Sequence, residues 1–259
     1  HHCLILNAAD RAGLQHVGFK VNDITDLAEA EAVAKDWGLM TRRVADEEVL
    51  GQGEGIMITL PSGHELNLFY HSDRVGYSYG MHNPDIVLDQ VEGVTPVTHL
   101  DHALLAGNDC DKTVKFLVEA LDFNLTETIL ASDGSPSAFF LTTSSTIHNL
   151  AFAPGPSNGL HHIAFYVNDR ADVIRRVDML KHRKIATLGY GISRHGIGGV
   201  TTTYFFDPSG NRNEFQCGVY EASTIRGNVP PIVWAGKNIP RGTFYYEATI
   251  PPNFFEVVT

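Results

Sequence analysis

A ten-residue segment near the start of the chain recurs in its second half. Residues 14–23 have the sequence LQHVGFKVND and residues 160–169 have LHHIAFYVND, so six of ten positions are identical at an offset of 146 residues. The tripeptide PSG at 61–63 recurs at 208–210, at an offset of 147. Because a duplicated sequence indicates a duplicated structural unit, we expect two related halves that join near residues 90–97.

Each half contains a smaller repeating unit of one strand, one helix and three further strands. Alternating apolar residues predict the strands, and apolar residues at helical spacing predict the helices. The sequence therefore predicts an α+β protein in which paired βαβββ units form curved, open barrels with a concave interior. In the second half, strands are expected over 98–105, 123–130, 138–142, 148–152, 160–167, 185–189, 200–206 and 213–218, and helices from 109 and over 169–182.

The first half contains one complete unit, over residues 14–70. Residues 2–6 precede it and align with the last strand of the neighbouring unit, at 148–152. No counterpart of residues 98–146 is present in the sequence. By symmetry, about 50 residues would precede residue 1, and a barrel without them would expose a strand edge. We therefore expect the first unit of the N-terminal domain to be missing from this sequence.

Charge and cysteine content limit the partners. The formal net charge is −11 without a basic cluster, whereas binding to nucleic acid requires a basic surface. The three cysteines are widely spaced and form neither a disulfide framework nor a CxxC metal site, so a reducing cytoplasm is expected. No apolar run approaches the roughly 20 residues that span a bilayer. Neither nucleic acid nor a membrane is an expected partner.

Three residues occupy matching positions in the two C-terminal units. His102 and His162 lie in the first strands of these units, and Glu214 lies in the last strand of the second unit. Alternate side chains of a strand face the concave interior, so the three are expected to meet there. Two histidines and one carboxylate on one face of a metal leave open positions, as in non-haem Fe(II) sites. Any one of them alone could be an ordinary hydrogen-bonded strand residue, and the matched register favours the metal site.

The N-terminal half has lost this set. His16 occupies the position of His162, but Asn67 falls where Glu214 stands, and no counterpart of His102 is present. His16 is therefore expected to be a core or hydrogen-bonded histidine. The chain is expected to divide into an incomplete, metal-free N-terminal repeat domain (1–93), a catalytic metal-binding domain (94–225) and a tail that packs on the catalytic domain (226–259).

The sequence motifs around these residues resemble the type I extradiol ring-cleaving dioxygenases of the vicinal oxygen chelate superfamily. The motifs are LDH at 100–102, LHH at 160–162 and YFFDPSGNRNE at 204–214. The resemblance runs from His2 to Phe255 and departs from the family pattern at Ser193, at Thr203 and in the missing first unit.

This resemblance implies a glyoxalase-like fold of paired βαβββ units. It implies that His102, His162 and Glu214 hold one Fe(II), in preference to Mn(II). It also implies cleavage of catechol or an alkyl-substituted catechol by O₂, giving 2-hydroxymuconic semialdehyde-type products in aromatic catabolism. A homotetramer is common in the family. Zn(II) would not serve, because it has no redox chemistry.

The resemblance also implies roles for residues near the metal. His195 matches a histidine that moves protons, a task that suits an imidazole. Tyr204 matches a tyrosine that donates to a substrate oxygen, and His148 matches a histidine near the deprotonated hydroxyl. A solvated loop position for His195 and a structural role for His148 are the alternatives. Phe140 and Ile197 are the implied pocket walls.

The remaining histidines are expected to be non-catalytic. His161 should point outward if His162 points inward, because neighbouring residues alternate along a strand. The tail lacks a βαβββ pattern, and its aromatic residues are expected to cap the site or to pack against a neighbour. The histidines without an expected role in catalysis are His1, His71, His82, His99, His161 and His182.

Two other functions remain open at this point. A metal-dependent glyoxalase-like lyase or a resistance protein of the same superfamily would use similar units, often with zinc, nickel or manganese. The presence of both His195 and Tyr204 favours the dioxygenase. An inactive small-molecule-binding module is the second alternative, and it would gain support if no further unit preceded His1.

Overall fold

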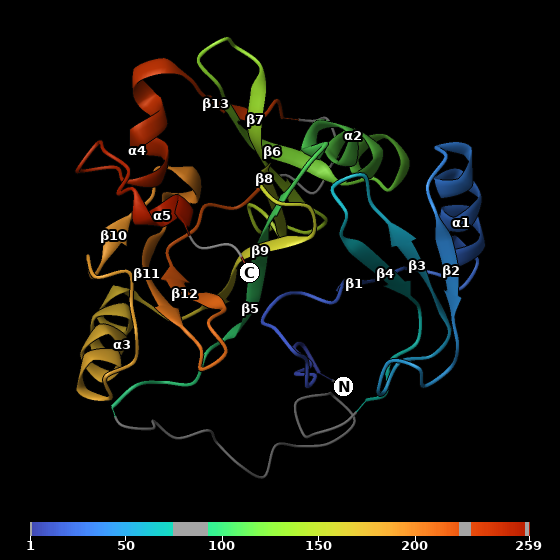
Figure 1. The fold of residues 1–259 in the computed structure, drawn as a ribbon, viewed down its shortest axis with the longest axis horizontal. Coiled ribbons are helices and arrows are strands. Elements are labelled where there is room, and N and C mark those ends of the chain that lie inside the picture. Colours follow the sequence, from blue (N-terminus) through green and yellow to red (C-terminus); the bar gives the residue numbers. More distant parts are fainter. Residues whose placement is uncertain (1, 75–92, 223–228, 257–258) are drawn as a thin grey trace.

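The computed structural model describes residues 2–74, 93–222, 229–256 and 259 (Figure 1). In this part of the chain the strands form one four-stranded and one nine-stranded sheet. Part of the expected junction between the halves at 90–97, namely residues 90–92, lies outside the described residues, as do His1 and His82. None of the described helices has the length and apolar character needed to cross a membrane.

The N-terminal unit forms the four-stranded sheet with one helix. The strand order is β1-β4-β3-β2, and β1 runs parallel to β4. Leu27, Ala30 and Ala34 of the helix are buried at helical spacing, so one face of the helix contributes to the core. The elements are β1 (Val17–Lys20), α1 (Asp26–Asp36), β2 (Thr41–Val44), β3 (Gly55–Thr59) and β4 (Glu65–Phe69).

The two C-terminal units share the nine-stranded sheet. The first strands of these units, β5 (His99–Gly107) and β9 (Gly159–Tyr166), pair antiparallel near its middle, and the order is β10-β11-β12-β9-β5-β8-β7-β6-β13. The other strands are β6 (Asn124–Leu130), β7 (Pro136–Thr142), β8 (Leu150–Pro154), β10 (Ser193–Arg194), β11 (Thr201–Phe206), β12 (Arg212–Cys217) and β13 (Ile232–Trp234). The helices are α2 (Cys110–Ala120), α3 (Arg170–His182), the 3-10 turns η1 (Ile197–Gly199) and η2 (Gly236–Asn238), α4 (Ile239–Thr243) and α5 (Asn253–Glu256).

The pairing register reproduces the sequence repeat. Gly18 of β1 pairs with Asn67 of β4, and Ala164 of β9 pairs with Glu214 of β12, in both cases in parallel. Gly18 and Ala164 are 146 residues apart, and Asn67 and Glu214 are 147 apart, which are the two offsets of the repeat. The duplication and the α+β class predicted from the sequence are confirmed.

Three expected strands differ in the structure. Residues 2–6 form no strand, because the sequence contains no counterparts of β5 and β7, the two partners of β8. The strand near 185–189 is reduced to one bridge between Thr187 and Phe205, and Gly189 follows at a φ of 88°. The strand expected from His148 begins at Leu150.

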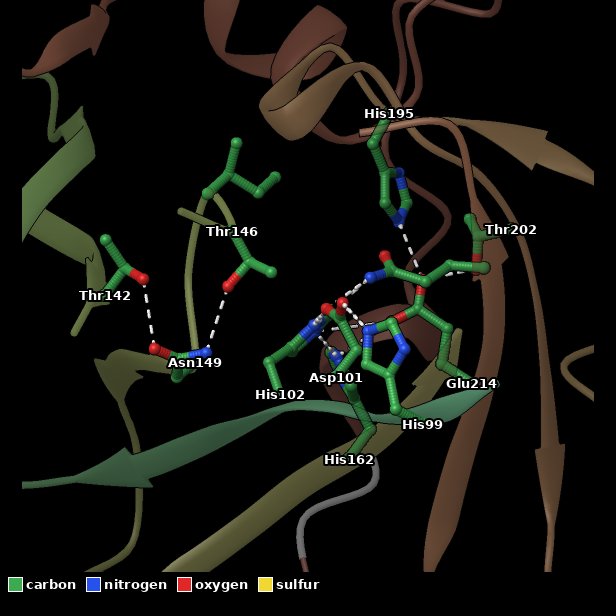
Figure 2. Close-up of polar contacts among 12 residues, drawn as sticks. His99, Asp101, His102, Thr142, Thr146, Asn149, His162, His195, Thr202 and Glu214 are labelled. Atoms are coloured by element: carbon green, nitrogen blue, oxygen red, sulfur yellow. Dashed lines mark hydrogen bonds and ion pairs between the residues drawn. The ribbon is translucent and has the colours of Figure 1, made fainter. Parts of the chain in front are cut away.

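The late start of β8 has a local cause. The side chain of Asn149 accepts from the backbone N–H of Thr143 at 2.9 Å. It also accepts from Thr142 Oγ1 and donates to Thr146 Oγ1, both at 3.0 Å (Figure 2). Such bonds between side chains and nearby backbone compete with the strand ladder. The chain therefore turns before β8, and His148 lies in the turn.

One hydrophobic cluster joins the two sheets. Leu27 of α1, Phe116 of α2 and Phe152 of β8 belong to the same set of buried side chains. The ring of Trp37 lies 5.5 Å from that of Phe116, and α1 and α2 lie side by side in Figure 1. The N-terminal unit thus packs on the outer side of β5–β8. Burial of shared apolar surface contributes most of the free energy that holds the two sheets together.

Candidate metal centre

Three side chains from neighbouring strands meet near the middle of the nine-stranded sheet (Figure 2). His102 on β5, His162 on β9 and Glu214 on β12 are 6%, 2% and 1% exposed. His162 Nε2 lies 3.0 Å from Glu214 Oε2 and 3.1 Å from His102 Nε2, and His102 Nε2 lies 3.6 Å from Glu214 Oε2. Two ligands at right angles, each about 2.1 Å from an ion, are about 3.0 Å apart. The spacing therefore fits three ligands on one face of a single ion.

This set stands alone in the described part of the chain. Among those residues, His102, His162 and Glu214 form the one group of three potential ligands whose donor atoms all lie within 4.8 Å of one another. The nitrogen and oxygen donors suit a divalent transition metal such as Fe(II) or Mn(II). The assignment of these residues as ligands stays a prediction, for which the geometry supplies a site of the right size.

A β-bulge lies directly before each of the two histidines. The pairing of β5 with β9 skips Asp101 on one strand and His161 on the other. Bulges re-aim side chains, and here both extra residues contact the next ring: Asp101 Oδ2 lies 2.7 Å from His102 Nδ1, and His161 Nδ1 lies 2.7 Å from His162 Nδ1. The expectation that His161 points outward is therefore wrong, because strict alternation holds only in a regular strand.

Asp101 sets the orientation of the His102 ring. A carboxylate accepts hydrogen bonds, so Nδ1 of His102 carries the proton, and Nε2 presents its lone pair to the centre. The side chain of Gln216 donates to the same oxygen of Asp101. Histidines that bind metals usually donate their other ring N–H to such a group. Asp101 had no expected role, although the residue stands in the LDH motif at 100–102.

Charge distribution at the centre suits a cation. Burial raises the pKa of the Glu214 carboxyl, but its hydrogen bond with His162 and the nearby His102 and His195 outweigh burial and hold the pKa well below its usual value. Burial lowers the pKa of His162 to about 4. Thr202 of β11 donates to Glu214 Oε1. At neutral pH the centre thus holds an ionised carboxylate, which is costly to bury without a compensating charge.

His195 and Tyr204 contact each other at the edge of the centre. The hydroxyl of Tyr204 lies 2.8 Å from His195 Nε2, while His195 Nδ1 donates to the carbonyl oxygen of Thr243 in α4. Nε2 of a neutral His195 therefore accepts from Tyr204. Burial lowers the pKa of His195 and raises the pKa of Tyr204. Tyr204 is also the cross-strand partner of Glu214, which explains its direction.

His148 stands beside His102, with ring centroids 4.2 Å apart. Its Nδ1 is buried and finds no hydrogen-bond partner among the described residues. Burial lowers its pKa well below the usual value, so the ring is neutral. The ring of Phe140 lies 5.2 Å from His148, and Phe140 packs with Ile197 in one buried cluster. The expected pocket-wall residues are therefore close to each other and to the centre.

The C-terminal tail covers the same region. The ring of Phe254 in α5 lies 5.6 Å from that of Tyr204 and 5.0 Å from that of His161. The guanidinium of Arg212, the first residue of β12, donates to the carbonyl oxygen of Phe254 at 2.6 Å. The sequence did not single out Arg212, whose buried guanidinium binds the C-terminal tail to the nine-stranded sheet.

The N-terminal counterpart of the centre contains an amide pair. Asn67 Nδ2 donates to Gln52 Oε1 at 2.9 Å, at the position that corresponds to Glu214. His16 is half-buried, and burial lowers its pKa. Of the other histidines, His99 is exposed and stacks on Tyr166. These placements leave the ligand set in the C-terminal units alone, within the described residues.

Known proteins resemble this chain along both halves. Residues 99–215 match the model of the glyoxalase/bleomycin resistance protein/dioxygenase superfamily, and residues 14–73 match that of the catechol 2,3-dioxygenase-like N-terminal domain. A metapyrocatechase of Pseudomonas sp. (strain CF600) is 31% identical over 259 residues, which covers 99% of this chain and 82% of the relative. A manganese-dependent 2,3-dihydroxybiphenyl 1,2-dioxygenase of Geobacillus genomosp. 3 is 24% identical, which covers 97% and 81%.

Solved structures share the architecture. The 2,3-dioxygenase LapB from Pseudomonas sp. KL28 superimposes with a TM-score of 0.77 at 31% identity, over 88% of this chain and 78% of the other. Homoprotocatechuate 2,3-dioxygenase from Brevibacterium fuscum, in complex with 3,4-dihydroxyphenylacetate, superimposes with a TM-score of 0.80 at 23% identity, over 97% and 76%. The second likeness shows the fold alone.

Proposed function

The chain belongs to the type I extradiol dioxygenases of the vicinal oxygen chelate superfamily, and from this we propose that it cleaves the ring of a catechol beside the diol. The co-substrate is O₂, the metal is one Fe(II) held by His102, His162 and Glu214, and the products are 2-hydroxymuconic semialdehydes. The observation that carries the proposal is the convergence of three ligand atoms, from three neighbouring strands, within 4.8 Å of one another.

The ion would supply the positions at which both diol oxygens and O₂ meet, together with the redox chemistry that ring cleavage requires. Iron is the metal we propose because two histidines and one carboxylate typify non-haem Fe(II) oxygenases. A relative named as manganese-dependent makes Mn(II) the competing choice. Direct comparison of the two metals belongs in the test.

The residues around the centre handle protons and orient the ring. Tyr204 would donate to a substrate oxygen in place of His195, its present acceptor. His195 would then hold or release a proton at Nε2. The unpartnered, neutral ring of His148 would accept the proton of a diol hydroxyl. Phe140 and Ile197 would pack against the ring and exclude water.

The proposal assigns these tasks to one part of the chain. Residues 94–225 form the catalytic domain, residues 1–93 take no metal, and residues 226–259 close the pocket. The amide pair of Asn67 and Gln52 supports the metal-free half, and the contacts of Phe254 with Tyr204 and His161 support the closing tail. The similarity to a metapyrocatechase at 31% identity argues against a glyoxalase-like lyase.

The test is metal loading followed by turnover. Anaerobic protein is loaded with one equivalent of Fe(II) or Mn(II), mixed with catechol or a methylcatechol, and then exposed to oxygen. We expect a yellow ring-fission product formed in equal amount to the O₂ consumed, with Fe(II) the more active metal. A colourless solution at full iron occupancy would contradict the proposal, and faster turnover with Mn(II) would contradict the choice of iron.

A further inference from the structure

Glu127 is a buried carboxylate on β6, a strand that is not a neighbour of β5, β9 or β12, which carry the three candidate ligands. It is 1% exposed and is the cross-strand partner of Phe140 on β7. Cross-strand partners project from the same face of a sheet, so Glu127 lies on the face that carries Phe140. That face is the one toward the centre, because the Phe140 ring lies 5.2 Å from His148.

Three donors from three separate segments converge on this carboxylate. The backbone N–H of Gly198 donates to Oε1 at 2.8 Å, and the hydroxyl of Tyr220 donates to the same oxygen at 2.7 Å. The indole N–H of Trp234 on β13 donates to Oε2 at 2.6 Å. Burial and the Glu127 carboxylate raise the pKa of Tyr220, so the phenol keeps its proton and acts as the donor. Hydrogen bonds to an ionised acceptor are among the stronger ones in proteins.

Two of these contacts reach the loop that follows His195. Gly198 has a φ of +64°, which favours glycine, and it directs its N–H to Glu127. The indole of Trp234 packs on Gly196 so closely that a Cβ there would lie 2.6 Å from the ring. Glu127 therefore touches the loop directly at Gly198 and, through the indole it orients, at Gly196.

The loop between these contacts carries residues of the proposed site. His195 precedes it, and Ile197 lies inside it and packs with Phe140. The ring of His195 is already held by Tyr204 and by the Thr243 carbonyl. The backbone after His195 needs its own support, because a glycine-rich segment has many accessible conformations.

We infer that Glu127 is a positioning residue for ring cleavage, which holds the segment Gly196–Gly199 and so sets where His195 and Ile197 stand relative to the metal centre. The inference rests on the proposed function. Glu127 itself meets no substrate, because it is buried and its oxygens are occupied by the three donors. A carboxylate is needed because it accepts at both oxygens, whereas a glutamine accepts at only one.

The deciding variant is Glu127→Gln, in which the new amide N–H₂ opposes at least one of the three donors. We expect full iron content and a kcat per bound iron about tenfold lower, since small misplacements of reacting groups are costly. Amide exchange should quicken in the peptide that holds residues 195–199 and stay unchanged in β5, β9 and β12. Glu119→Gln, on the exposed side of α2, is the matched control and should behave as wild type.

A second variant tests the reason for the loss. In Glu127→Gln/Trp234→Phe the indole donor is gone, and so is the ring that packs on Gly196, so kcat should stay at or below that of the single variant and exchange in residues 195–199 should stay fast. A double variant that recovers the wild-type kcat counts against the inference, because the loop would then not need the indole.

Three other results would overturn the inference. They are an unchanged kcat and KM at full iron content, a fall in iron content with unchanged kcat per iron, and unchanged loop exchange. If the wild-type chain cleaves no catechol, the proposed function fails on its own. The exchange comparison would then still decide whether Glu127 holds the loop.

Discussion

The hydroxyl of Tyr204 lies 2.8 Å from Nε2 of His195, and that nitrogen lies 3.7 Å from Glu214 Oε1. Because the other ring nitrogen of His195 donates to the Thr243 carbonyl, a neutral His195 accepts the phenolic proton. A substrate oxygen that reaches Tyr204 would compete for the same proton and release Nε2. The Tyr204 hydroxyl can therefore donate either to His195 or to a substrate oxygen, next to the proposed metal ligand Glu214.

Replacement of Tyr204 by phenylalanine tests this pair. The ring stays in contact with His162 and Phe254, but the donor is lost. We expect kcat/KM for catechol to fall about 10- to 100-fold, which corresponds to the free energy of one hydrogen bond to a charged group. Iron content, measured on the same sample, should match wild type. A loss of iron in step with activity would mean that Tyr204 supports the ligands instead of the substrate.

The asymmetry between the halves is tested by one variant in each. Glu214→Gln should lose bound iron and turnover together, because a neutral amide replaces the one anionic ligand. Asn67→Ala, at the corresponding position of the N-terminal unit, should keep both, although loss of its bond to Gln52 will lower the thermal midpoint. Metal analysis and turnover are measured for each. Equal effects on iron at the two positions would refute the asymmetry.

Asp101 should tune the affinity for the metal. In Asp101→Asn the charged acceptor for His102 Nδ1–H is lost, while the size of the side chain is kept. Loss of such a partner typically weakens metal binding about 10- to 100-fold, which competition with a chelator would measure. Asp111→Asn, exposed on α2, is the control. Unchanged affinity would show that Gln216 and the strand alone hold the ring.

Acidification should destabilise the fold through His64. This ring is buried, with Nε2 3.0 Å from the Gly159 carbonyl oxygen and Nδ1 2.9 Å from Ser62 Oγ. Burial lowers its pKa from the usual 6.5, so the unfolded chain binds a proton more readily than the folded one. The stabilisation is therefore complete above about pH 6.5 and is lost as the pH falls toward the lower pKa of the folded state.

The variant His64→Gln isolates this effect, because glutamine can still donate to Gly159 and does not titrate. We expect the free energy of unfolding of the metal-free chain, from urea titrations at about pH 7.5 and about pH 5.5, to change less than in wild type. His71→Gln, at an exposed histidine, should keep the wild-type slope. Equal slopes in all three proteins would show that His64 contributes nothing to acid sensitivity.

Local pattern and repetition determined much of this protein. The duplication predicted the βαβββ units, and the pairings of Gly18 with Asn67 and of Ala164 with Glu214 agree with it. Strand periodicity also placed His102, His162 and Glu214 on one face, where the structure brings them together. These inferences depend only on residue spacing, because in a regular strand or helix the spacing of two residues fixes whether their side chains point to the same face.

The tertiary structure decided the features that depend on irregular backbone or on distant segments. Whether a strand bulges is set by its pairing partner, so the inward turn of Asp101 and His161 was not readable from alternation. The three groups that donate to Glu127 lie 71, 93 and 107 positions further along the chain. The sequence around Glu127 therefore does not predict these hydrogen bonds. The sequence alone determined which residues of the regular strands face the interior, because side chains alternate there, and the packing of distant segments decided what holds them in place.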